Sequence, residues 1–146
     1  MKPYPLQAYG ELATGIRQEL YSAETIAARV QELGQEISRD YAGRNPLLVG
    51  VLKGVFIFMA DLYRAITIPA EVLLRNLRAR EPASLQVCAL FDKAKRRLID
   101  VPIKYKGFDL PDRFVVGYGL DHRERYRNLS GVGVLKPEVF QKSGTA

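Results

Sequence analysis

The sequence predicts an α/β fold in which helices flank a mostly parallel sheet. Residues 47–52 form an apolar run of strand length, and a tight Lys-Gly turn joins it directly to a helical pattern over 55–66. A second helical pattern follows Ser22, a residue type that favours the N-cap, and ends before the turn-forming cluster at 42–46. Its apolar positions are Ile26, Val30, Leu33, Ile37 and Tyr41. Strands that alternate with helices are typical of parallel sheets.

Further elements are predicted along the chain. The expected strands are a short start over 68–72 and the runs 85–91, 99–103, 114–120 and 132–135, with polar loops at 107–112 and 121–129. Residues 73–80 have the pattern of the last turns of a helix. Val72 and Leu73 therefore join a strand start to a helix end with no turn residue between them. We expect residues 1–21 to form a loosely attached arm and residues 22–146 to form a single domain.

Composition limits the classes of protein to consider. Of the 146 residues, 47% are hydrophobic and 26% charged, which is ordinary for a soluble domain. No apolar run reaches membrane-spanning length, and the N-terminus lacks the apolar stretch of a secretory signal. Cys88 is the single cysteine and cannot form an internal disulfide. We therefore expect a cytoplasmic protein with no membrane partner.

The chain is basic, with a net charge of +6 and a pI near 9.5. Such a charge suits either a nucleic acid or a polyanionic small molecule. The basic residues gather at 75–80, 93–97, 104–106 and 123–127, where they are mixed with acidic and apolar residues. No zinc-finger spacing, basic zipper or aromatic RNA-binding motif accompanies them. We therefore favour a phosphorylated metabolite over a nucleic acid as the partner.

The Lys53-Gly54 turn is the first candidate site. It follows the carboxyl end of the strand over 47–52, where open α/β sheets bind their ligands. The helix that begins there offers free N–H groups and a partial positive charge to an anion. The turn is thus predicted to form half of a phosphate site. The other interpretation, a glycine that only permits the turn and a solvated lysine, remains open.

Four more residues are candidates by position. Lys93 and Arg97 follow another predicted strand, and they suit a carbonyl and a phosphate, respectively, although this segment by itself favours a solvated charged loop. Phe114 suits either the core or stacking on a flat heterocycle. Asp121 ends a strand that carries two glycines, and its carboxylate suits Mg²⁺.

Several blocks of sequence together resemble one known family. They are GVLKG (50–54) with FIFMADL (56–62), REPAS (80–84), GFDLPDRFVVGYGLD (107–121) and YRNL (126–129). In consistent order over about residues 22 to 140, they resemble the bacterial hypoxanthine-guanine phosphoribosyltransferases, purine-salvage enzymes with the Rossmann-like type I phosphoribosyltransferase fold. The resemblance implies transfer of 5-phosphoribosyl from phosphoribosyl pyrophosphate to hypoxanthine or guanine with Mg²⁺. The products are IMP or GMP and pyrophosphate, and a homo-oligomer, dimer or tetramer, is implied.

The resemblance also implies a role for each matching residue. The pyrophosphate would be held by the Lys53-Gly54 loop and neutralised by Arg127 and Arg97. The purine would receive a hydrogen bond from Lys93 at its 6-oxo group, stack on Phe114 and meet the Val115 backbone at its exocyclic edge. Asp121 would hold Mg²⁺.

The chain departs from the family at one place. The family signature, two acids followed by an Asp-Thr-Gly or Asp-Ser-Gly loop, and a mobile lid with a Ser-Tyr-Gly stretch are absent from the sequence. The resemblance places both between Val72 and Leu73, as an internal deletion that also removes a central strand. The sheet then either re-pairs around a gap or is completed by a partner chain.

The deletion changes the functional expectation. The family's candidate base lies in the absent loop, so no residue of this chain is assigned as catalytic, and we predict little or no turnover. The alternative function is a non-catalytic relative that binds a purine nucleotide or pyrophosphate, or that acts by co-assembly with an intact copy.

Overall fold

The computed structural model describes residues 5–50, 53–73, 83–97 and 100–141. The chain divides into two compact units, residues 1–27 with 113–146 and residues 28–112, and each is described by itself. Both helices and parallel strand pairs are present, which confirms the predicted α/β class. None of the helices in these residues combines the length and the apolar character that crossing a bilayer requires.

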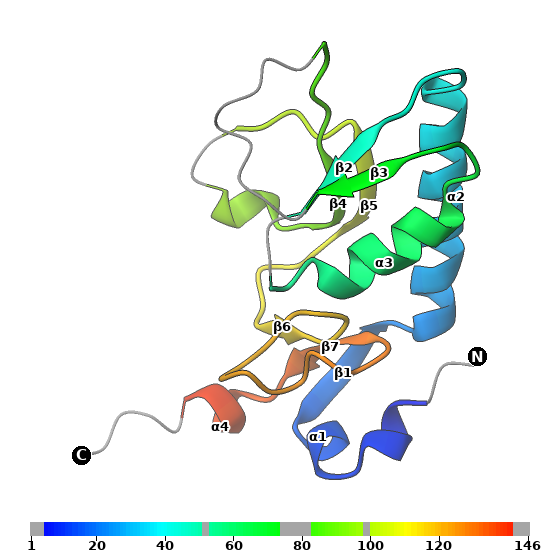
Figure 1. Cartoon of the computed structure of the whole chain (residues 1–146). Coiled ribbons are helices and arrows are strands. Elements are labelled where there is room, and N and C mark those ends of the chain that lie inside the picture. The colour runs from blue at the N-terminus through cyan, green and yellow to red at the C-terminus, as the bar shows by residue number, and fades with distance from the viewer. Residues whose placement is uncertain (1–4, 51–52, 74–82, 98–99, 142–146) are drawn as a thin grey trace. The chain divides into compact units, whose positions relative to one another are not determined.

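The first unit is built on an antiparallel sheet of three strands in the order β1-β7-β6 (Figure 1). Its elements are η1 (Leu6–Tyr9), α1 (Glu11–Thr14), β1 (Ile16–Tyr21), β6 (Val115–Val116), β7 (Val132–Leu135) and α4 (Pro137–Phe140). Its buried cluster consists of Ile16, Val116, Tyr126, Leu129 and Leu135. Side chains of η1, α1 and α4 pack against this cluster.

The prediction that residues 1–21 form a loosely attached arm is wrong for residues 16–21, which form strand β1. Strand β1 pairs with β7, with Ile16 opposite Leu135 and Tyr21 opposite Val132. The two strands approach closely at Gly133, where a Cβ would lie 2.6 Å from the Cγ2 of Ile16. A local pattern could not reveal this pairing, because the partner strand lies at the other end of the sequence.

The second unit carries two separate parallel strand pairs, β2 with β3 and β4 with β5 (Figure 1). Its elements are α2 (Ala23–Asp40, which begins in the first unit), β2 (Leu47–Val49), α3 (Phe56–Ala65), β3 (Glu71–Leu73), β4 (Cys88–Asp92), η2 (Ala94–Arg96) and β5 (Tyr105–Asp109). The register places Leu48 opposite Val72 in one pair and Phe91 opposite Phe108 in the other.

Helix α2 confirms the predicted amphipathic pattern. The backbone N–H of Thr25 donates to the Ser22 hydroxyl at 3.3 Å, which is the hydrogen bond of an N-cap. The predicted apolar positions inside the helix are all buried: Ile26, Val30, Leu33 and Ile37. Tyr41 lies just beyond the helix end.

Helices α2 and α3 approach closely at Gly34. A Cβ at this position would lie 2.5 Å from the Cβ of Ala65, so only glycine permits the contact. The buried Ser38 hydroxyl reinforces it by donating to the Gly34 carbonyl at 2.7 Å and accepting the Thr67 N–H at 3.0 Å. A small residue and one hydroxyl thus fix how α3 lies on α2.

Three predicted elements differ from the structure. A strand was predicted over 99–103 and a loop over 107–112. The structure instead has strand β5 at Tyr105–Asp109, and residues 100–103 have no regular structure. Pro102 explains this, because proline has no N–H to donate to a ladder. Leu73, predicted to lie in the last turns of a helix, belongs to β3, and the other residues of that predicted segment, 74–80, lie outside the described part. Strand β6 ends at Val116 because Gly117 takes a φ of +105° and starts a turn.

Candidate functional site

The Lys53-Gly54 turn lies where the sequence predicts it, between β2 and α3. The N–H of Phe56 donates to the Lys53 carbonyl at 3.3 Å, and no side chain caps the helix start. Residues 51 and 52 lie outside the described part of the chain. Gly50 is buried, and a Cβ there would lie 2.9 Å from the Met59 sulfur, so glycine allows the chain to pass close to α3. The strand–turn–helix prediction is confirmed, and the uncapped N–H groups suit an anion.

Lys93 lies directly after β4, again at the carboxyl end of a strand. Its Nζ is 3.8 Å from Oδ1 of Asp112, and the Nε of Arg96 donates to the same oxygen at 2.7 Å. The hydrogen bond from Arg96 lowers the pKa of the Asp112 carboxyl, and the charges of Arg96 and Lys93 add to this effect. Asp112 therefore places an acceptor beside the ammonium group of Lys93.

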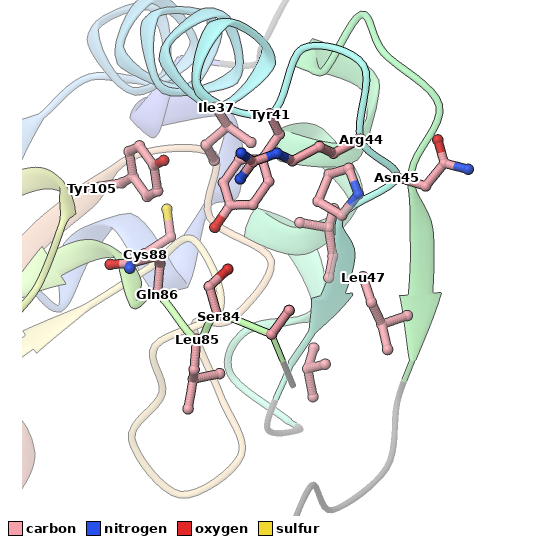
Figure 2. Close-up of a pocket in the computed structure, with 14 residues that line it drawn as sticks. Ile37, Tyr41, Arg44, Asn45, Leu47, Ser84, Leu85, Gln86, Cys88 and Tyr105 are labelled. Carbon is pink, nitrogen blue, oxygen red and sulfur yellow. The ribbon is translucent and has the colours of Figure 1, made fainter. Parts of the chain in front are cut away.

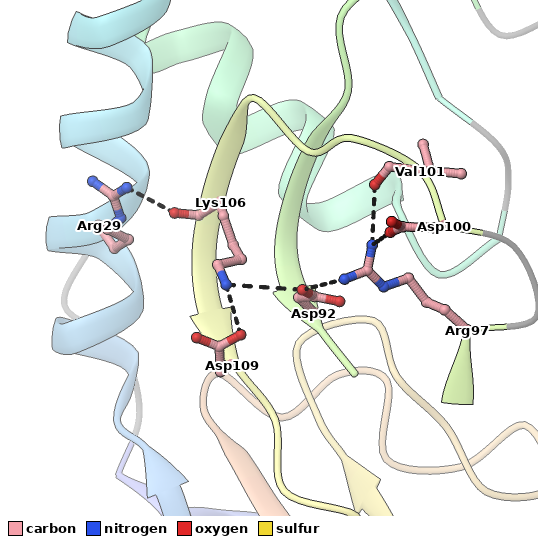
Figure 3. A network of polar contacts seen from close by, with 7 residues as sticks. All are labelled: Arg29, Asp92, Arg97, Asp100, Val101, Lys106 and Asp109. Carbon is pink, nitrogen blue, oxygen red and sulfur yellow. Dashed lines mark hydrogen bonds and ion pairs between the residues drawn. The ribbon is translucent and has the colours of Figure 1, made fainter. Parts of the chain in front are cut away.

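Arg97 is held by contacts within its own unit (Figure 3). Its guanidinium donates to Asp92 at 3.2 Å, to Asp100 at 3.4 Å and to the Val101 carbonyl at 3.0 Å. The side chain of Asp92 is only 4% exposed, so Arg97 is its close charged partner. A buried carboxylate needs such a partner, and the three contacts favour a structural role for Arg97.

Asp92 also belongs to a network across β4 and β5 (Figure 3). It lies opposite Asp109 in the register, and two carboxylates in that position repel each other. The Nζ of Lys106 lies 2.8 Å from Asp109 and 3.9 Å from Asp92, which offsets the repulsion. The guanidinium of Arg29 in α2 donates to the Lys106 carbonyl at 2.7 Å. The burial of Asp92 was not predicted from the sequence, because it depends on partners supplied by the turn after β4 and by β5.

Phe114 and Val115 lie at the start of β6 in the first unit. The Phe114 ring stacks on Phe140 with centroids 5.1 Å apart and meets His122 edge to face at 5.3 Å. It nevertheless remains 40% exposed. Val115 pairs with Val134 of β7. A ring that is fixed by neighbours and still exposed suits stacking on a flat ligand. The sequence offered no signal for the contact with Phe140.

Asp121 and Arg127 form an ion pair at 2.9 Å in the loop after β6. The other Asp121 oxygen accepts the Glu124 N–H at 2.9 Å, and Arg127 donates to the Gly119 carbonyl at 2.8 Å. The buried Nε of Arg127 has no hydrogen-bond partner among the described residues. Two of the predicted residues of the first unit, Asp121 and Arg127, are thus adjacent, and the hydrogen-bonding capacity of Arg127 is only partly used.

Asp121, the predicted magnesium ligand, has few other metal-binding groups near it in the part of the chain that the structure describes. In the described ranges, no group of three His, Cys, Asp or Glu side chains could hold a metal ion. Mg²⁺ is often bound by one or two carboxylates, with substrate phosphates and waters as its other ligands. Asp121 therefore fits Mg²⁺ as its one protein carboxylate, with substrate phosphates and waters as the other ligands.

Comparison with known proteins decides the family. No model of a protein family matches the chain. The hypoxanthine-guanine phosphoribosyltransferase of Streptococcus agalactiae is 35% identical over 179 aligned positions, which cover 90% of this chain and 99% of the relative. The chain belongs to the hypoxanthine-guanine phosphoribosyltransferase family. The Mycobacterium avium enzyme of the same name is 38% identical, over 87% of this chain and 89% of the relative.

The structure of the chain is also similar to solved structures of hypoxanthine phosphoribosyltransferases. A hypoxanthine phosphoribosyltransferase from Staphylococcus aureus has a TM-score of 0.84 at 31% identity, covering 90% of this chain and 99% of that one. The hypoxanthine phosphoribosyltransferase of Trypanosoma cruzi, solved with the product IMP, has a TM-score of 0.81 at 29% identity, covering 88% and 95%. The family's type I phosphoribosyltransferase fold is thus the fold of this chain.

The family alignment is longer than the chain itself. It spans 179 positions, whereas the chain has 146 residues, so the Streptococcus agalactiae relative contains residues that have no counterpart here. At the predicted junction the backbone runs straight through β3. The chain is therefore a shortened member of the hypoxanthine-guanine phosphoribosyltransferase family.

Proposed function

We propose that the chain acts in purine salvage by joining hypoxanthine or guanine to the 5-phosphoribosyl group of phosphoribosyl pyrophosphate, with slow turnover. The observation that supports this most is the 35% identity to a hypoxanthine-guanine phosphoribosyltransferase over 90% of the chain. In the proposed reaction the purine N9 forms a bond to the ribose C1′, the bond from C1′ to pyrophosphate breaks and its electron pair stays with the pyrophosphate, and the N9 proton passes to water. We expect turnover to be slow because the sequence lacks the loop that carries the family's candidate base, and no other residue is assigned that role.

The proposed pyrophosphate contacts follow the residues that the family resemblance assigns. The N–H groups at the start of α3 and the Lys53 ammonium would bind the leaving pyrophosphate, which gains negative charge as it departs. Arg127, which is paired with Asp121, is the other cation that the resemblance assigns to pyrophosphate. When bound, Mg²⁺ neutralises part of the pyrophosphate charge, and Asp121 is the proposed protein ligand. Arg97, which the resemblance also assigns to pyrophosphate, is proposed instead as the partner of Asp92.

The proposed purine contacts rest on three residues. Lys93 would donate to the 6-oxo group, which rejects adenine because an amino group cannot accept that hydrogen bond. Phe114 would stack on the base with its exposed face, and the Val115 backbone would meet the exocyclic edge. The Asp112 carboxylate forms an ion pair with Lys93 at 3.8 Å.

A steady-state assay with hypoxanthine, phosphoribosyl pyrophosphate and Mg²⁺ tests the proposal. We expect IMP to form at well below about 1 s⁻¹, the lower end of ordinary enzyme rates. Lys93→Ala should lower this rate, whereas Lys95→Ala, an exposed lysine two residues away, should leave it unchanged. An ordinary rate would contradict the slow turnover, and equal effects of the two variants would contradict the role of Lys93.

The second candidate function, nucleotide binding without turnover, follows from the length of the alignment. A chain that lacks residues of its relatives can retain Lys53, Lys93 and Asp121 and still bind GMP or pyrophosphate. Calorimetry with GMP would show binding that Lys93→Ala weakens by at least tenfold and Lys95→Ala leaves unchanged. No detectable binding at millimolar GMP would reject this function.

We also propose that the protein is a cytoplasmic homo-oligomer, a dimer or tetramer, with no membrane or nucleic-acid partner. Sedimentation equilibrium should give a mass that is a multiple of the 16.4 kDa chain. A monomer would contradict the oligomer. Binding to DNA or RNA at low salt, where phosphate contacts are strongest, would contradict the absence of a nucleic-acid partner.

A further inference from the structure

The second unit contains a cavity of about 590 Å³ next to β2 (Figure 2). Its lining includes Ile37 of α2, Tyr41 just beyond the end of α2, the segment 83–86 and Cys88 at the start of β4. All three residues of β2, Leu47–Val49, line it as well. None of the residues proposed above for purine or pyrophosphate lines this cavity.

The cavity runs along the edge of β2. Successive side chains of a strand point to opposite faces of the sheet, so a cavity on one face would meet only alternate residues. Leu47, Leu48 and Val49 are consecutive, and all three line it. Among the described residues β2 pairs with β3 alone and β4 with β5 alone. Within the described part of the chain, β2 and β4 therefore each have one edge without a ladder partner.

Open edges of this kind bind strands. An unpaired edge presents a row of N–H and C=O groups, and another extended chain can satisfy them. Parallel strands are normally buried inside larger sheets, and a two-stranded pair is only marginally stable by itself. Both features favour a further strand beside β2.

The lining is mostly apolar, with Arg44 as the one charged residue among the described residues that line it, and it suits an apolar occupant. Leu47 and Leu85 both line the cavity and are 41% and 67% exposed, so a segment placed there would bury apolar surface. Burial raises the pKa of the Cys88 thiol to about 12, so it is neutral at physiological pH and adds no charge. An apolar small molecule would cover the leucines but would leave the backbone groups of β2 unsatisfied.

We propose that this cavity accepts one extended, apolar segment of a second polypeptide, which pairs as a β-strand along the open edge of β2. The family alignment agrees with this, because a relative contains residues that have no counterpart in this chain. A segment supplied from outside would complete the sheet that the shortened chain leaves open. The proposal does not depend on turnover or on any purine or pyrophosphate contact.

Hydrogen exchange with a synthetic strand tests the proposal. The probe is the peptide Ac-Lys-Val-Ile-Val-Ile-Val-Lys-amide, whose terminal lysines keep it soluble. Saturating peptide should slow exchange several-fold in fragments covering 46–50 and 85–89, with little change in β1, β6 and β7. Fluorescence anisotropy of the labelled peptide gives the Kd.

Two matched controls decide the outcome. Leu85→Asp puts a charge into the cavity and should raise the Kd at least tenfold, whereas Val101→Asp, at an exposed residue outside the lining, should not change it. A peptide with N-methyl groups on alternate amides of one edge should also bind at least tenfold more weakly. Equal affinity of both protein variants, equal binding of the N-methylated peptide, or no protection at 46–50 would overturn the proposal. Protection by a free apolar dye equal to that by the peptide would assign the cavity to small molecules instead.

Discussion

At the residue scale, Arg97 illustrates how an arginine after a strand end can stabilise the fold instead of binding substrate. It is the closer of the two cations paired with the buried Asp92, since the Lys106 ammonium is 3.9 Å away. Arg97→Gln should therefore lower the free energy of unfolding by about 2–3 kcal/mol, because a buried carboxylate loses its close partner. Urea denaturation measures this loss.

The neighbouring Arg96 supplies the control. Its ion pair with Asp112 lies on the surface, so Arg96→Gln should cost less than about 1 kcal/mol. Calorimetric titration of pyrophosphate, under conditions where Arg97→Gln is still folded, separates the two roles of Arg97. An unchanged affinity supports the structural role, whereas a tenfold loss of affinity without a loss of stability would assign Arg97 to pyrophosphate.

At the scale of elements, the crossing of α2 and α3 depends on Gly34. Gly34→Ala gains up to about 1 kcal/mol of helix propensity, but its Cβ would overlap Ala65. Overpacking costs about 1–3 kcal/mol, so we expect net destabilisation in thermal melts. The backbone carbonyl carbon and oxygen of Ala65 would lie at 2.6 Å, almost as close as its Cβ, so Gly34→Ala combined with Ala65→Gly should recover only part of the lost stability. Strict additivity would contradict this contact.

The end of α2 is tied to β5 by a pH-dependent cluster. Oδ2 of Asp40 accepts from the Tyr105 hydroxyl at 2.7 Å and lies 2.8 Å from the Lys104 ammonium. The hydrogen bond from Lys104, and then that from Tyr105, lowers the pKa of Asp40. A lowered carboxyl pKa stabilises the fold above the unfolded value of about 3.9, and this stability is lost as the pH falls through the lower folded pKa.

At alkaline pH, the contribution of Tyr105 to stability depends on pH in the opposite direction to that of Asp40. Burial and then the hydrogen bond to Asp40 raise the pKa of Tyr105, so its contribution is complete below about 10 and is lost as the pH rises through the folded pKa. We expect Asp40→Asn to flatten the acid limb of a melting temperature–pH profile. Asp100→Asn, at a fully exposed side chain, should keep the wild-type limb. Parallel acid limbs for Asp40→Asn and the wild type would contradict the assignment.

The elements also show what a sequence can predict. Helices α2 and α3 were found because an amphipathic helix repeats its pattern locally, and the Lys53 turn followed from its place after a strand. Strand β1 was missed because only its pairing with β7 identifies it. The burial of Asp92 escaped prediction for a related reason, since it depends on partners brought together by the turn after β4 and by β5. Contacts between distant segments leave no local pattern.

At the scale of the whole molecule, the net charge of +6 should affect how anions bind. A basic protein attracts a polyanion over distances of about one Debye length, which shrinks from about 10 Å at 0.1 M salt to about 3 Å at 1 M. Pyrophosphate affinity should therefore fall on the order of tenfold across this range, whereas affinity for uncharged hypoxanthine should change little. Calorimetric titrations in sodium chloride measure both affinities.

Lys53→Ala should reduce the salt dependence of pyrophosphate affinity, because it removes a cation from the proposed anion site, whereas Lys95→Ala should reduce it less. Equal salt dependence for the two ligands would show that pyrophosphate binding does not rely on the cations proposed for it.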